Sequence, residues 1–302
     1  MADFLIHCLL IILMPPLLFG VINRTKATFA GRTGAPLLQP YFDLYRLLRK
    51  GSVFSRTTTW VFRVGPLVTL AATLTAALLI PLGNHLPPLS FNGDMILFIY
   101  LLALGRFFTT AAALDTGSSF EGMGAAREVT FSCLAEPVIC IVLLVLSRLS
   151  GSLSLSGMLI NSSAGLWMTS GAALVMLVSG LFFVLLSENC RIPFDDPNTH
   201  LELTMIHEVM VLDHSGPAFG LILYGASLKL FIMGALFLHV LLPLRLANPF
   251  LDWLVFLMSM ILLAVVIGVV ESGMARYRLI RVPQMLLAAC VLSAFAMLLV
   301  VR

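Results

Sequence analysis

The chain has 302 residues, of which 60% are hydrophobic and 11% are charged, and its mean hydropathy is +1.03. Soluble domains carry roughly a quarter charged residues, so this composition excludes a soluble protein and indicates a bundle of membrane helices. The formal net charge of +3 is too small to indicate a nucleic-acid partner.

Eight apolar stretches are long enough to cross the hydrocarbon core of a bilayer, which takes about 20 residues of helix. We expect spans near residues 4–22, 62–82, 94–114, 130–148, 167–187, 217–241, 252–270 and 284–301. Residues 1–302 would then form a single all-α polytopic membrane domain. We expect the first stretch to be a retained span rather than a signal peptide, because its basic residues Arg24 and Lys26 follow the apolar run.

A short amphipathic helix is expected between the first two spans, near residues 37–50. Pro40 can open a helix, and four side chains then recur at helical spacing on one face: Tyr41, Leu44, Tyr45 and Leu48. Basic residues occupy the rest of the turn. The pattern is typical of a cytoplasmic lateral helix on the membrane surface, and a plain surface anchor explains it as well as any functional role.

The basic residues are distributed unevenly over the loops. The odd-numbered loops and their flanks contain 13 Lys and Arg residues, whereas the opposite side contains three, Arg148, Arg245 and Arg302. Because cytoplasmic loops are enriched in basic residues, we expect the odd-numbered loops in the cytoplasm and both termini outside. Most acidic residues lie beside the same loops, so the chemistry is expected on the cytoplasmic side.

Several ionisable residues fall within the spans or at their ends, where such groups are costly and mark a pathway or a buried pair. Arg106, Lys229 and Arg191 are candidate counter-charges. The candidate carboxylates for proton or ion coupling are Asp115, Glu136, Glu188, Asp195, Glu202, Asp213 and Glu271. One interpretation pairs these groups to lock the helices together, and the other is a hydrated proton path, which the row of carboxylates favours.

Residues 187–216 form the densest polar segment, and the spacing of seven between His200, His207 and His214 raises the question of a metal site. Seven helical residues span about 10.5 Å, too far for two of these side chains to bind one ion. His207-Glu208 also lacks the second histidine of H-E-x-x-H. We therefore expect no metal site and interpret the segment as a contact surface for a partner subunit.

The remaining chemistry-bearing residues indicate no catalytic site in this chain. The five cysteines include no C-x-x-C pair, so neither an iron–sulfur cluster nor a zinc site is expected. The first loop and the segment 187–216 together are interpreted as a docking platform for partner subunits. Its candidate residues are Arg32, Gln39, Arg46, Arg127, Asp196, His200, His207 and Glu208.

Three motifs occur in order along the chain. Residues 31–34 (GRTG) lead to 38–40 (LQP), residues 188–195 read ENCRIPFD, and residues 213–216 read DHSG. They resemble G-R-x-G…L-Q-P, E-x-x-R-x-P-F-D and E-Y-S-G of the quinone-chamber membrane subunit of respiratory complex I. Glu136 also lies where that family has a glutamate in its fourth span. The resemblance covers nearly the whole chain and implies eight spans with a lateral helix.

Within that superfamily the chain looks closer to the membrane subunit of energy-converting nickel–iron (NiFe) hydrogenases of the formate-hydrogenlyase type. Residues 114–120 (LDTGSSF) and 124–128 (GAARE) are similar to their L-D-T-G-S-x-F and G-A-S-R-E, and 271–276 (ESGMAR) to their E-N-S-M-A-R. Asn198 and His200 depart from the family's run of glutamates after Asp195. This departure weakens the transfer of the family's carboxylate cluster and argues against a conventional quinone site.

The resemblance implies a non-catalytic membrane anchor and coupling subunit in a prokaryotic inner membrane. Its implied partners are the large and small subunits of a NiFe hydrogenase, an iron–sulfur subunit, antiporter-like membrane subunits and the lipid bilayer. The nickel–iron centre and the iron–sulfur clusters would lie in those partners, with no cofactor in this chain. The alternatives are a quinone-chamber subunit of complex I, a stand-alone transporter, which the absence of internal symmetry disfavours, and a purely structural anchor.

Overall fold

The computed structural model describes residues 2–160, 164–195, 205–243 and 248–301. Within these ranges it contains no strand, and eight of its helices are long and apolar enough to cross a membrane. They are α1 (Ala2–Phe29), α3 (Trp60–Leu79), α4 (Asp94–Asp115), α5 (Ser119–Ser150), α7 (Ala164–Glu188), α8 (Gly216–Leu241), α9 (Pro249–Gly273) and α10 (Arg281–Val301). The predicted class, an all-α polytopic membrane protein with eight spans, is confirmed.

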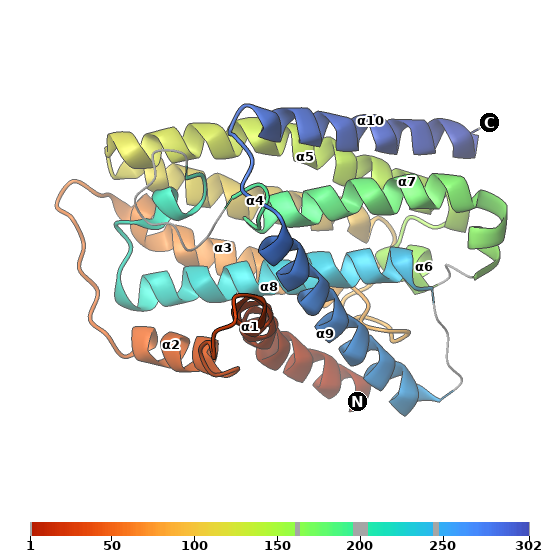
Figure 1. Ribbon diagram of the computed structural model, residues 1–302, viewed down its shortest axis with the longest axis horizontal. Coiled ribbons are helices and arrows are strands. Elements are labelled where there is room, and N and C mark those ends of the chain that lie inside the picture. The colour runs from red at the N-terminus through yellow and green to blue at the C-terminus, as the bar shows by residue number, and fades with distance from the viewer. Residues whose placement is uncertain (1, 161–163, 196–204, 244–247, 302) are drawn as a thin grey trace.

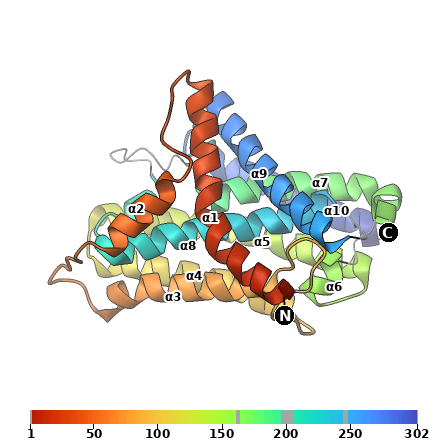
Figure 2. The ribbon, with the colours of Figure 1, turned by 90° about the horizontal axis from the view of Figure 1, so that it is seen from below.

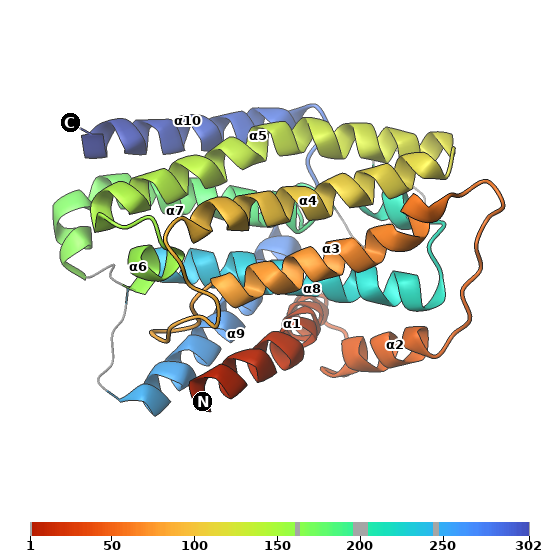
Figure 3. The same ribbon diagram turned by 180° about the vertical axis from the view of Figure 1, so that it is seen from behind.

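The spanning helices form an elongated bundle. Helices α5, α7, α8 and α10 run along its long axis (Figure 1), and α3 and α4 lie side by side on the opposite face (Figure 3). Helices α1 and α9 form a tilted pair that crosses the others (Figure 2). Helix α8 contacts α1, α3, α7 and α9, so its side chains form the centre of the core.

The shorter elements distinguish the two ends of the bundle. One end carries α2 (Gln39–Leu48), the 3-10 helix η1 (Glu208–Val211) and the α4–α5 turn. The other carries α6 (Leu155–Ile160), the start of α9 and both chain termini (Figure 1). We call these the α2 end and the α6 end.

Helix α5 begins well before the predicted span of 130–148. Its 32 residues start at Ser119 and extend for about 48 Å, which exceeds the ~30 Å of a hydrocarbon core. Hydropathy detects only the apolar part, because the first turns carry Glu121, Arg127 and Glu128. The predicted third loop is therefore mostly helical and shortens to residues 116–118.

Helix α2 falls inside the predicted lateral segment of residues 37–50. It packs against α8 and α1, with Leu47 and Leu48 over Gly220 of α8, and the Tyr41 hydroxyl donates to the Leu13 carbonyl of α1. Phe42 and Tyr45 remain exposed. Its position on a membrane surface stays a prediction.

The close approach of α1 and α9 depends on one glycine. A Cβ atom added at Gly268 would lie 2.8 Å from the Cβ of Thr25 on α1, closer than real side chains pack. Glycine at this position lets the two helices touch within one turn of Lys26 and Glu271, which meet across the same contact. The packing of two apolar helices thus sets the distance between two charged groups.

Candidate functional site

Five charged side chains from helices α4, α5, α7 and α8 meet inside the bundle. Arg106 of α4 donates to both carboxylate oxygens of Glu188, each at 2.7 Å, and to Glu136 of α5. The Lys229 ammonium of α8 lies 2.6 Å from the same Glu188 carboxylate, and Glu128 lies 3.7 Å from the Arg106 Nε. We call these five residues the Arg106 cluster.

The Arg106 cluster contains one carboxylate more than its cations neutralise. The Glu188 side chain is 4% exposed and lies between two cations, whereas the Glu136 side chain is 42% exposed. Net charge at membrane depth is costly, and with all five groups ionised the cluster carries one surplus negative charge. Glu136 is the most accessible of its three carboxylates.

A second cluster joins α1, α9 and the segment after α7. The buried carboxylate of Glu271 lies 2.8 Å from the Lys26 ammonium and 3.4 Å from the Arg191 guanidinium. That guanidinium also stacks over the Phe19 ring, 4.3 Å from its centroid. This Glu271 cluster has one cation in excess, opposite in sign to the Arg106 cluster.

A cavity of about 200 Å³ connects the two clusters. Glu188 and Lys229 line it from one cluster, Arg191 from the other, and His207 and Glu208 from the segment before α8. A buried water needs about 10–15 Å³ of such space and several polar partners. The cavity is therefore large and polar enough to hold a chain of water between Glu188 and Arg191.

Asp195 holds the segment on the far side of this cavity. Its carboxylate accepts hydrogen bonds from the backbone N–H groups of Ile206 (3.1 Å) and His207 (3.2 Å), and from the Arg276 guanidinium at 2.9 Å. The arrangement fixes residues 205–207 against the α9–α10 connection. Asp195 therefore positions His207 beside the cavity.

Comparison with known proteins identifies the family to which this chain belongs. The family model described as NADH dehydrogenase matches residues 2–302. The chain belongs to this family. Its relatives include hydrogenase-4 component C of Escherichia coli (strain K12), 32% identical over 284 residues, or 92% of this chain and 89% of the relative. Formate hydrogenlyase subunit 4 of the same organism is 32% identical over 287 residues, covering 93% and 92%.

Two further similarities concern one more relative by sequence and one solved structure with the same fold. An NADH-quinone oxidoreductase subunit of Anaplasma phagocytophilum (strain HZ) is 28% identical over 217 residues, covering 66% of this chain and 62% of that protein. A chain of the membrane-bound sulfane sulfur reductase, an archaeal respiratory membrane complex, shares the fold with a TM-score of 0.84 at 20% identity, covering 99% and 100%. The predicted resemblance to complex I and formate-hydrogenlyase-type subunits is confirmed, and the protein is a multi-pass membrane protein.

Two predicted coupling carboxylates of this family member lie away from both clusters. Asp115 accepts hydrogen bonds from the Thr59 backbone N–H (2.7 Å), the Thr59 hydroxyl and the Phe62 N–H, so it caps the start of α3. Asp213 is exposed, and its backbone N–H donates to Glu121 at 3.1 Å. Glu202 lies outside the described residues.

The predicted docking residues divide between the surface and the interior. Arg32 and Arg46 are exposed, and Gln39 donates to Asp43 within α2 at 2.8 Å. Arg127 is half-buried and donates to the Met205 carbonyl at 2.8 Å. His207 and Glu208 line the cavity, and Asp196 and His200 lie outside the described residues. Among the residues described, no group of three or more His, Cys, Asp or Glu side chains is arranged to hold a metal ion.

Sequence analysis missed two members of the clusters, Lys26 and Glu128. Lys26 follows the apolar run of the first span, and only the continuation of α1 to Phe29 places it beside Glu271. Glu128 precedes Glu136 by about two helical turns and lies on the same face of α5. The spacing of the two glutamates would indicate this only if the helix were expected to begin before the apolar stretch. Both residues occupy helix extensions outside the apolar spans.

Proposed function

We propose that this chain is the non-catalytic membrane anchor and coupling subunit of a membrane-bound NiFe hydrogenase of the formate hydrogenlyase or hydrogenase-4 type. The 32% identity to two Escherichia coli subunits, each over about nine-tenths of both chains, supports the assignment to this type. The single observation that carries the coupling role is the Arg106 cluster with its adjoining cavity.

The coupling role follows from the charges of the cluster. Glu188 is shared by Arg106 and Lys229, so any change at the cavity that moves Arg191 or His207 alters the field at Glu188. A change in that field shifts the proton affinity of the surplus carboxylate. The chain would relay a redox event in the peripheral subunits in this way, as a proton bound or released at Glu136.

Glu136 also indicates where the next subunit lies. Its side chain is 42% exposed on a face of α5 where Cys133 and Pro137 are exposed too. A carboxylate at membrane depth is costly against lipid, so a neighbouring membrane subunit with a polar side chain would cover this face. An antiporter-like subunit is the implied partner.

The proposed orientation places the α2 end in the cytoplasm of a prokaryote and both termini outside its inner membrane. The α2 end would carry the docking platform, with Arg32 and Arg46 exposed on it. The hydrogenase large and small subunits and the iron–sulfur subunit would dock there. Their nickel–iron centre and iron–sulfur clusters would supply the redox chemistry, with no cofactor in this chain.

A quinone-chamber subunit of complex I is the second candidate. The cavity of about 200 Å³ favours it, since Phe19 and Leu223 add apolar lining to the charged groups, as does the 28% identity to an NADH-quinone oxidoreductase subunit. A quinone-competitive inhibitor that protects this chain from covalent labelling would support this candidate over the hydrogenase.

Purification of the tagged chain in mild detergent, with mass spectrometry and a hydrogen-evolution assay, tests the proposal. We expect a NiFe hydrogenase pair to co-purify with hydrogen-evolving activity. Recovery of a quinone-reducing NADH dehydrogenase, or of the chain alone, would contradict it.

A matched pair of charge reversals tests the docking platform. The double variant Arg32→Glu/Arg46→Glu should lose the peripheral subunits, because it reverses the charge of the docking surface. Arg148→Glu, an exposed arginine at the α6 end of α5, should retain them. Equal losses in both variants would reject the proposed orientation.

A further inference from the structure

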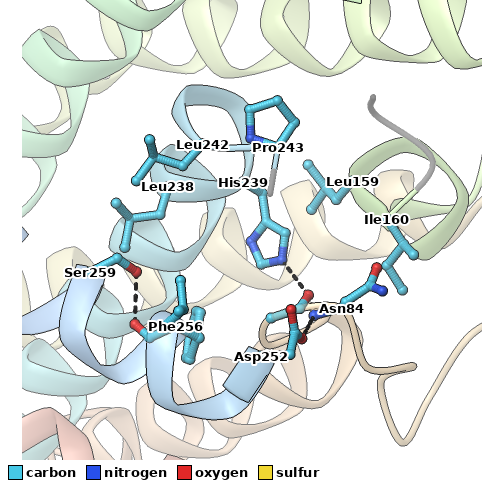
Figure 4. Close-up of a pocket in the computed structure, with 12 residues that line it drawn as sticks. Asn84, Leu159, Ile160, Leu238, His239, Leu242, Pro243, Asp252, Phe256 and Ser259 are labelled. Carbon is cyan, nitrogen blue, oxygen red and sulfur yellow. Dashed lines mark hydrogen bonds between the residues drawn. The ribbon is translucent and has the colours of Figure 1, made fainter. Parts of the chain in front are cut away.

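A histidine at the α6 end makes two contacts that a neutral imidazole cannot both satisfy. The Nδ1 atom of His239 lies 2.7 Å from the Ala235 carbonyl oxygen, and the Nε2 atom lies 2.8 Å from the Gly83 carbonyl oxygen (Figure 4). Carbonyl oxygens only accept hydrogen bonds, and a neutral imidazole carries one N–H. Both contacts are hydrogen bonds only when both ring nitrogens are protonated.

The surroundings hold the ring in this position. Ala235 lies one turn earlier on the same helix, and Gly83 belongs to a turn in which its φ is +60°. A Cβ atom at Gly83 would lie 2.9 Å from the Asp252 carboxylate, so the turn requires glycine. The next residue, Asn84, donates its backbone N–H to Asp252 at 2.6 Å, and His239 and Asp252 thus bind the same turn from α8 and α9.

A carboxylate is therefore available to offset the charge of a protonated His239. Asp252 is buried, and Figure 4 shows its carboxylate bonded to the same turn that the His239 ring contacts. Three titratable groups lie nearest to this turn, His85 within it and Asp3 and His7 on α1, and the His7 ring contacts the Ala77 carbonyl at 3.3 Å. Asp94 at the start of α4, bonded to Ser154 and Leu155, and the exposed Arg148 near the end of α5 are further charged groups at this end.

A route for protons leads from the surface to this pair. The exposed carboxylate of Asp3 lies 3.5 Å from Nδ1 of His85, and Nε2 of the same ring lies 3.6 Å from Asp252. The His85 ring stacks on Trp253 with centroids 4.2 Å apart, which keeps one nitrogen toward each carboxylate. Separations of this size are just beyond hydrogen-bonding distance, and a small movement of a side chain closes them.

A small cavity completes the route. It has a volume of about 50 Å³ and is lined by His239, Asp252, Asn84 and Ser259 among apolar side chains (Figure 4). This space holds about three waters. Towards the Arg106 cluster, in contrast, residues 230–238 of α8 (LFIMGALFL), all described in the structure, are buried and carry no polar side chain. Along α8, this apolar stretch separates His239 from Lys229, so the polar groups of the α6 end do not continue along the helix to the Arg106 cluster.

We propose that His239 is a proton-binding site, and that it exchanges its proton with water at the α6 end through Asp252, His85 and Asp3. A proton that arrives at one nitrogen of His85 makes an imidazolium, which releases the proton of its other nitrogen to Asp252. The resulting carboxylic acid donates to a neutral His239 through the cavity water and returns to carboxylate. Release follows the same steps in reverse. The proposal stands independently of the hydrogenase assignment, since it uses none of the residues of the Arg106 cluster.

Solid-state NMR of the full wild-type chain in lipid vesicles tests the protonation. The chain is labelled with 15N at histidine side chains and with 13C at glycine carbonyls, and the Gly83 carbonyl selects His239 through the 15N–13C dipolar coupling. We expect this ring to carry two N–H groups at pH 7.5. A single N–H and one unprotonated nitrogen in the selected ring would overturn the proposal without any variant being needed.

Exchange of the selected N–H groups with solvent deuterium tests the route. His85→Gln should leave His239 protonated and slow its exchange by about 10²-fold, the lower end of what a positioned acid–base group contributes. Asp252→Asn should lower the doubly protonated fraction, because the compensating charge is gone. His214→Gln, at the α2 end, is the matched control and should change neither quantity. An unchanged exchange rate in His85→Gln would reject the route.

Discussion

The Arg106 cluster and the His239 site both consist of titratable groups, but in the first the groups contact other side chains and in the second they contact the backbone. In the Arg106 cluster, charged side chains from α4, α5, α7 and α8 bind one another. At the His239 site, the histidine and Asp252 bind the backbone of the 83–84 turn. A side-chain network leaves an unpaired buried charge when one member is removed, whereas a backbone partner accepts any replacement of the same hydrogen-bonding sense. The two regions should therefore differ in their tolerance of substitution.

The largest effect is expected at the centre of the Arg106 cluster. Glu188→Gln leaves both Arg106 and Lys229 without their shared carboxylate, and breaking a buried ion pair typically costs about 3–5 kcal/mol. We expect a large loss of folded, assembled protein after detergent extraction, measured by thermal unfolding and by recovery of the complex. The double variant Glu188→Gln/Lys229→Gln should recover part of the loss, and no recovery would show that the two groups do not interact.

A pH-dependent effect is expected from the histidine at the α2 end. Burial lowers the pKa of His214 from 6.5 to about 4, with its ring 3.9 Å from the Phe62 ring. Above pH 6.5 the ring is neutral whether the loop is docked or detached, so the contact is fully stable there. As the pH falls toward 4, the detached state binds the proton more strongly, and docking of the loop weakens by up to about 3 kcal/mol.

Hydrogen exchange measures this weakening. Protection of the amides in residues 205–215, corrected for the intrinsic pH dependence, should decrease between pH 6.5 and pH 4. His214→Gln should make the protection independent of pH in that range. An unchanged protection in the wild-type chain would mean that His214 is accessible in the docked loop.

A smaller effect is expected when the same type of substitution is made at the α6 end. Asp252→Asn keeps an oxygen that can accept the hydrogen bond from the Asn84 N–H, and His239 can release its extra proton once the compensating charge is gone, so no buried charge is left unpaired. We therefore expect a loss of about 1 kcal/mol, well below that of Glu188→Gln. Thermal unfolding of the two variants in the same detergent makes the comparison. Equal losses would contradict the distinction between a network of side chains and a network with the backbone.

The smallest effect on stability is expected at the edge of the Arg106 cluster. Glu136 is partly exposed and Arg106 retains Glu188, so Glu136→Gln should cost less than about 1 kcal/mol and leave the complex assembled. Under the proposed coupling role it should still reduce ion movement, measured with a pH-sensitive dye in vesicles that contain the complex. Unchanged turnover and ion movement would leave the purely structural anchor as the remaining interpretation.

The sequence predicts the eight spans well because burial in lipid demands long apolar stretches, and hydropathy reads these directly. The helix at residues 39–48 is predicted from Pro40 and the helical spacing after it, whereas its position on a membrane surface is still a prediction. The start of α5 at Ser119 escapes detection because a helix that extends past the membrane carries charges such as Arg127. Hydropathy therefore measures the membrane crossing and not the helix.

The sequence predicts which charged residues belong to the candidate site, but not which of them lie together. Arg106, Glu136, Glu188 and Lys229 are recognisable singly, because each is an ionisable residue in or beside an apolar stretch. Their grouping depends on which helices are neighbours, and nothing in the chain order places Lys26 beside Glu271. Asp115 shows the converse, since a carboxylate at the end of a span serves as a cap for the next helix in space.

The apolar stretch of α8 between Lys229 and His239 has an electrical consequence. Ten residues of helix cover about 15 Å, roughly half of a ~30 Å hydrocarbon core. If water reaches the cavities on both sides, a transmembrane voltage falls mainly across this shorter distance, and the local field is about twice that in plain bilayer. Moving one elementary charge across this segment changes its energy by about 2.3 kcal/mol for every 100 mV of membrane potential. The membrane voltage would therefore act mainly on charge that moves between the Arg106 cluster and His239.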